Sequence, residues 1–90
     1  MKHASVQTIE TLAPLLGRLR AIPGLKERKP GTFYLRSSAF LHFHEDPAGL
    51  FADVKLDPGE FSRFPVNTAQ EQDKLLSAAV RAAAGGHAAQ

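Results

Sequence analysis

The chain contains no cysteine and no tryptophan. Without thiols it can form no disulfide, no cysteine zinc finger, no iron–sulfur cluster and no thiol nucleophile. Neither sign of charge dominates, because 11 Lys and Arg stand against nine Asp and Glu, for a formal net charge of +2. This balance does not indicate a nucleic-acid binder. No hydrophobic run approaches the roughly 20 residues of a membrane span. We therefore expect no membrane segment, and the missing cysteines favour the cytoplasm.

The remaining composition is that of one small folded domain. Of the 90 residues, 43% are hydrophobic and 22% are charged, which is too apolar for a disordered chain. Seven glycines and six prolines imply frequent turns and hence short strands. The N-terminus has no unbroken apolar core of the kind a secretory signal needs. We expect residues 1–84 to form a single α+β domain and residues 85–90 a flexible C-terminal tail.

Two segments have the apolar periodicity of helices. Residues 5–21 carry large apolar residues every three or four positions, which predicts an amphipathic helix. Pro14 predicts a bend or break near Ala13, because proline removes a helical hydrogen bond. A second helix begins at Thr68, whose spacing from Glu71 is that of a capping box.

Between these helices lie four apolar runs separated by turn sequences rich in proline and glycine. The predicted strands are Thr32–Arg36, Ala39–Glu45, Leu50–Leu56 and Phe61–Val66. Residues 25–31 are interpreted as a charged connection. The predicted fold is α+β, a four-stranded antiparallel meander sheet with the N- and C-terminal helices packed on one face (α-β-β-β-β-α).

The turn Asp46–Gly49 predicts the pairing of the two central strands. It places His42 opposite Asp53 and sends the apolar row of residues 50–56 to the helix-covered face. The first hairpin stays ambiguous, since a two-residue loop would bring Phe33 and Leu35 beside His42 and a three-residue loop would bring Tyr34 there. The position of Arg63 in the last strand is also open.

The opposite face of the predicted sheet is rich in aromatic and ionisable side chains, whereas a purely solvated face would carry Thr, Lys and Glu. The candidate ligand-binding or interface residues are Tyr34, Arg36, Phe40, His42, His44, Phe51 and Asp53. We interpret this outer face as an interface, because a small core benefits from added burial. The predicted function is a non-catalytic binding or self-associating module, with a homodimer or another protein as partner.

An alternative interpretation centres on His42, His44 and Asp53. Two imidazoles two residues apart on one strand, with a carboxylate across the ladder, are a donor set that metals and small ligands use. A metal- or small-ligand-binding protein, with or without enzymatic activity, therefore stays open. Two histidines and one carboxylate make a weak motif and no nucleophile motif accompanies them, so we assign no catalytic residue, no metal ligand and no cofactor. Acidic residues near the basic ones argue against a nucleic-acid partner.

The strand containing His42-Phe43-His44, together with Pro23-Gly24, Phe33 and an acidic, leucine-rich last helix, resembles the small uncharacterised family labelled luciferase-domain proteins. A fainter likeness is to YjbR-like proteins, which share the leucine-rich helix, the Pro-Gly and a Phe-containing strand. Neither resemblance implies a catalytic mechanism or light emission.

Overall fold

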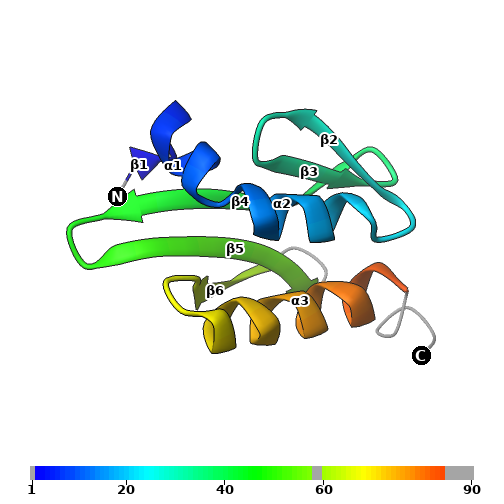
Figure 1. Ribbon diagram of the computed structural model, residues 1–90. Helices are drawn as coiled ribbons and strands as arrows, with labels where there is room; N and C mark the ends of the chain where they lie inside the picture. The colour runs from blue at the N-terminus through cyan, green and yellow to red at the C-terminus, as the bar shows by residue number, and fades with distance from the viewer. Residues whose placement is uncertain (1, 58–59, 85–90) are drawn as a thin grey trace.

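The computed structural model describes residues 2–57 and 60–84, which form an α+β domain with an antiparallel sheet (Figure 1). The elements are β1 (Lys2–His3), α1 (Val6–Thr11), α2 (Ala13–Arg20), β2 (Leu25–Lys29), β3 (Thr32–Leu35), β4 (Ser38–Asp46), β5 (Gly49–Asp57), β6 (Glu60–Pro65) and α3 (Ala69–Ala83). The strands follow the order β2-β3-β4-β5-β6, and β1 pairs separately with β4. The α+β class and the antiparallel sheet are confirmed. The predicted tail, residues 85–90, lies outside the described residues.

The longer helices α2 and α3 pack on the same face of the sheet and enclose the core against it (Figure 1). Fully buried leucines come from both helices, and strands β3, β4 and β5 supply the apolar side chains facing them. These strand residues are Phe33, Phe40, Leu41, Phe43, Ala52 and Val54. No helix of the described segments covers the opposite, outer face. None of these helices combines the length and apolar character that crossing a bilayer requires.

The predicted first helix is two helices. Ser5 caps α1 by accepting a hydrogen bond from the Thr8 backbone N–H at 3.2 Å. The chain leaves helical geometry at Leu12, where φ is −90° and ψ is 9°, and α2 then begins at Ala13 with Pro14 in its first turn. Proline is tolerated there because a first-turn N–H has no helical partner. The interruption predicted near Ala13 is confirmed.

The segment interpreted as a charged connection is in fact strand β2, and the prediction of four strands was wrong. Leu25 and Glu27 are half-buried, whereas Lys26 and Arg28 are exposed, so the segment alternates as an edge strand does. Glu27 tolerates its inward position because it forms an ion pair with Arg20. The density of charge concealed this alternation in the sequence.

The pairing of β4 with β5 follows the predicted register, with His42 opposite Asp53 and Phe43 opposite Ala52. The turn between these strands supplies glycine where the backbone requires it, since Gly49 has φ of +135°. Side chains therefore alternate as expected where β4 pairs with β5, from Leu41 onward, which places His42, His44 and Asp53 on the outer face.

Phe40 was predicted on the outer face, and this placement was wrong. Tyr34 pairs with Ala39 but Phe33 pairs with Leu41, so β4 contains one extra residue, Phe40, at a β-bulge. The bulge turns the Phe40 ring into the core, where it is 2% exposed. Bulges reverse side-chain direction locally, and strict alternation counted back from His42 could not reveal this one.

Arg36 does not belong to the sheet face either. Strand β3 ends at Leu35, which pairs with Ser38, and the two loop residues Arg36 and Ser37 have φ of 53° and 72°. Two consecutive positive φ values are the geometry of a type I′ hairpin turn. Arg36 is therefore an exposed turn residue. The loop has two residues, yet the bulge prevents the pairing that a two-residue loop alone would give.

Candidate functional site

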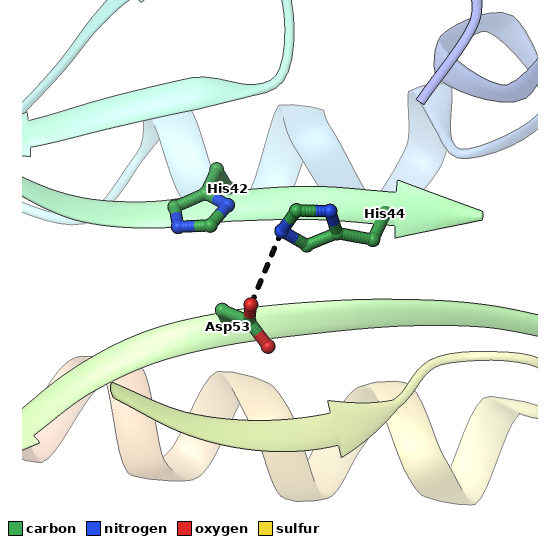
Figure 2. A group of neighbouring side chains, drawn as sticks. All are labelled: His42, His44 and Asp53. Carbon is green, nitrogen blue, oxygen red and sulfur yellow. Dashed lines mark ion pairs between the residues drawn. The ribbon is translucent and has the colours of Figure 1, made fainter. Parts of the chain in front are cut away.

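Two imidazoles and a carboxylate meet on the outer face of the sheet (Figure 2). His42 and His44 lie two residues apart on β4, and Asp53 lies opposite His42 on β5. The donor atoms of these three side chains are all within 4.8 Å of one another. Nε2 of His44 is 3.1 Å from Oδ2 of Asp53. The cluster depends on the β4–β5 register, because a slip of one residue would send the imidazoles into the core.

The cluster is well shielded although no helix of the described segments covers it. The side chains of His44 and Asp53 are only 14% and 10% exposed. Neighbouring rings supply the cover: the Phe61 ring centroid lies 5.1 Å from that of His42, and the two imidazole centroids are 4.7 Å apart. Phe51, opposite His44, is half-buried. Shielding of this kind strengthens electrostatic interactions, because less water screens the charges.

Arg63 on β6 completes the cluster. It lies opposite Asp53 and holds the carboxylate with two hydrogen bonds, from Nε to Oδ1 at 2.8 Å and from Nη2 to Oδ2 at 2.9 Å. Such a bidentate pair fixes the orientation of a carboxylate as well as neutralising its charge. Asp53 is therefore anchored from one side by a guanidinium and faces the imidazoles on the other.

The sequence left Arg63 unplaced because the last hairpin is irregular. Asp57 pairs with Glu60, but Lys55 pairs with Phe61, so the register shifts by one residue between these pairs. Counting back from the turn without the shift would place Phe64 opposite Asp53. The amino-acid composition of β6 could have identified Arg63 as the partner of Asp53. A buried carboxylate needs a cationic partner, and Arg63 is the only basic residue in β6.

Arg63 controls the ionisation of the carboxylate. The hydrogen bonds from its guanidinium lower the pKa of Asp53, and they outweigh burial, which acts in the opposite direction. Positive charge on His44 and His42 also lowers the pKa of Asp53. The same pairing raises the pKa of Arg63. Asp53 is therefore ionised at neutral pH, where it acts as an acceptor or as an anionic ligand and not as a proton donor.

The other predicted site residues are distributed around the cluster or lie apart from it. Tyr34 is half-buried on β3, and the Arg28 guanidinium lies 4.9 Å from the centre of its ring. Phe51 borders the cluster. Arg36 and Phe40 do not take part, since one is in a turn and the other is in the core.

A cavity of about 340 Å³ adjoins the cluster, and its wall includes both Tyr34 and His42. Phe43 of β4 also lines the cavity, and the other wall residues come from the β2–β3 turn and from residues 4–9, for which no sequence pattern predicted a shared site. His42 thus belongs both to the charged cluster and to the cavity.

Comparisons of the chain with models of protein families, with curated proteins and with solved structures find no match.

Proposed function

We propose that the protein binds a divalent transition-metal ion, with Zn²⁺ as the test ion, through His42, His44 and Asp53. The observation that supports this most is the convergence of three donor atoms of the right chemical types within 4.8 Å of one another. Imidazole nitrogen and carboxylate oxygen are common ligands of Zn²⁺ and of other first-row metals.

The spacing of the donors suits this proposal. Zinc–nitrogen distances near 2.0–2.1 Å imply ligand atoms about 3.4 Å apart in a tetrahedral site. Nε2 of His44 and Oδ2 of Asp53 already lie 3.1 Å apart. The donor atoms that lie farther apart, up to 4.8 Å, would move closer by rotation of an imidazole ring when the ion binds. Three protein ligands leave a fourth position for water or another small molecule.

Arg63 acts on this site from behind the carboxylate. It orients Asp53, which is what outer partners of metal ligands do. Its positive charge also opposes a second cation nearby, so we expect only moderate affinity. Each carboxylate oxygen has two lone pairs, and the guanidinium therefore does not occupy all the acceptor capacity of Asp53.

The test is a Zn²⁺ titration of the purified chain in competition with a chromogenic chelator. We expect micromolar affinity at pH 7.5 that weakens in His42→Ala, His44→Ala and Asp53→Asn. Removing a direct ligand should weaken Zn²⁺ binding at least as much as removing an outer partner of a ligand, which costs roughly 10–100-fold in affinity. Asp73→Asn is the matched control, since it removes the same charge from an exposed ion pair on α3. Unchanged affinity in His42→Ala and Asp53→Asn, or dissociation constants above 1 mM in the wild type, would contradict the proposal.

A second candidate is self-association of two copies through the outer face. It is favoured by Phe61, which is 42% exposed and shares with the half-buried Phe51 a face that no described helix covers. Sedimentation between 10 µM and 1 mM tests it. We expect a dimer that Phe61→Ser weakens and that Val80→Ser, which removes an exposed apolar side chain from α3, leaves unchanged. A wild-type monomer at 1 mM would exclude this candidate. We further propose the cytoplasm as the compartment, on the absence of cysteine.

A further inference from the structure

The cavity beside His42 lies at the edge of β4, where the paired strand changes from β3 to β1. Strand β3 pairs with β4 as far as Leu41, and β1 begins to pair at His44. Between these two pairings the Phe43 carbonyl accepts a hydrogen bond from the Ala4 N–H at 3.3 Å, and the cavity of about 340 Å³ lies in the gap between β1 and β3. In Figure 1 the gap lies between β1 with α1 and the β2–β3 hairpin.

The walls of the cavity are held in place by direct packing. Gly31, in the β2–β3 turn, is buried and has φ of +79°, and a Cβ atom there would collide with Cδ1 of Ile9 on α1. The Gly31 backbone N–H donates a hydrogen bond to Glu27 at 2.8 Å. Turn and helix therefore meet without space between them, and the cavity is preformed.

The cavity wall contains both apolar and polar residues. The residues that line the cavity include the apolar Ile9 and Phe43 and also Lys29, Thr32 and Tyr34, whose side chains carry an ammonium or hydroxyl group. None of the described residues that line the cavity is acidic. An occupant therefore meets one positive charge, hydrogen-bond donors and an apolar surface.

The negative charge of Glu27, the acidic residue of the same hairpin, is neutralised by a neighbouring cation. It forms an ion pair with Arg20 and accepts the Gly31 N–H, and the bond to Arg20 is the main reason that the pKa of Glu27 is lowered. Arg20 thus neutralises the negative charge of Glu27. Lys29 has no such ion pair within residues 2–57 and 60–84.

We infer that this cavity binds a small organic monoanion, with its apolar body against Ile9 and Phe43 and its carboxylate at Lys29 and Thr32. The volume is near the lower limit for ligand pockets, about 300 Å³, and fits an aromatic or branched monocarboxylate. The two sites share His42, but Lys29 and Thr32, which would hold the carboxylate, do not belong to the metal cluster.

The experiment is a titration of the ¹⁵N-labelled full chain with benzoate, followed by NMR in the presence of a chelator. Removing free metal ions makes the outcome independent of Zn²⁺ binding. For a ligand of this size we expect a dissociation constant of about 1 mM, with shifts centred on Gly31, Thr32 and Phe43. Benzamide has the same shape without the charge and should bind at least about fivefold more weakly.

Two lysine variants provide a matched pair. Lys29→Met should weaken benzoate binding about fivefold, because it removes the cation and keeps most of the side chain. Lys26→Met removes the same charge from the same strand, outside the cavity wall, and should leave the affinity unchanged. Absence of shifts at 20 mM benzoate, equal affinity for benzamide, or equal effects of the two variants would overturn the inference. Circular dichroism of each variant confirms that the fold is retained.

Discussion

Replacement of Asp53 by Asn should destabilise the fold at neutral pH and leave it unaffected in acid. Asp53 is 7% exposed and accepts two hydrogen bonds from Arg63 at 2.8 and 2.9 Å. Asn is nearly isosteric, so the substitution removes the negative charge without creating a cavity. The prediction therefore isolates the electrostatic contribution of the pair.

The size of the expected loss in unfolding free energy follows from the solvent exposure of Asp53 and Arg63. A hydrogen bond to a charged group contributes about 1.5–3 kcal/mol when both partners are shielded, whereas exposed ion pairs contribute about 0–1 kcal/mol. The Arg63 side chain is 48% exposed and the Asp53 side chain 10%. Water on the Arg63 side screens the ion pair, and the buried carboxylate has lost part of its hydration, so both effects reduce the net stabilisation. We therefore expect Asp53→Asn to lower the free energy of unfolding by about 1–2 kcal/mol at pH 7.

The pH dependence has a definite sign. The pKa of Asp53 is lower in the folded chain than in the unfolded chain, so its stabilising contribution is fully present above the unfolded value of about 3.9. This contribution disappears as the pH falls through the folded value, because the carboxyl group is then protonated in both states. The difference between wild type and Asp53→Asn should therefore vanish toward pH 2.

Urea unfolding followed by circular dichroism at pH 7, 4 and 2 measures this difference. Asp73→Asn is the control, since Asp73 pairs with Arg18 on the surface with both side chains at least 60% exposed. That variant should lose less than about 0.5 kcal/mol. An Asp53→Asn protein as stable as the wild type at pH 7, or a difference that persists unchanged at pH 2, would show that the charge of Asp53 does not stabilise the fold.

Three further substitutions test other parts of the account. Arg63→Met leaves the shielded Asp53 carboxylate without its cation, so it should lower the urea midpoint more than Asp53→Asn does; a smaller loss of stability would contradict the assigned role of Arg63. Gly31→Ala forces a residue with a Cβ into positive φ against Ile9, which should cost about 1–2 kcal/mol in urea unfolding; a neutral result would mean that the turn is not held against α1. Thr68→Ala removes the side-chain cap of α3 and should cost about 1 kcal/mol in thermal unfolding, and an unchanged melting temperature would count against the capping box.

The central hairpin could be predicted from sequence because two independent signals agree there. The turn Asp46–Gly49 fixes the pairing by its length, and the apolar alternation of residues 50–56 fixes which face is buried. Both signals place His42 opposite Asp53. The amino-acid pattern alone therefore suffices to bring His42, His44 and Asp53 together on one face.

The errors arise where backbone irregularity or charge conceals a regular pattern. The bulge at Phe40 changes the side-chain direction with no distinctive residue to mark it, because a bulge residue need not be glycine. Strand β2 carries four charged residues in five, and only their alternate burial identifies it. The register shift before Arg63 is likewise invisible in the sequence. The cavity requires contacts between Ile9 and the distant β2–β3 turn, which no local pattern encodes.

The resemblance of the His42-Phe43-His44 strand to luciferase-domain proteins stays a prediction, and the proposed chemistry rests on the geometry of the cluster alone.

Anomalous diffraction from crystals of the protein loaded with Zn²⁺ tests the proposed metal site most directly. We expect one strong peak on the outer face, about 2.0–2.2 Å from a ring nitrogen of His42, a ring nitrogen of His44 and a carboxylate oxygen of Asp53. A crystal that shows the His44, Asp53 and Arg63 contacts intact, with the anomalous signal elsewhere or absent, would contradict it.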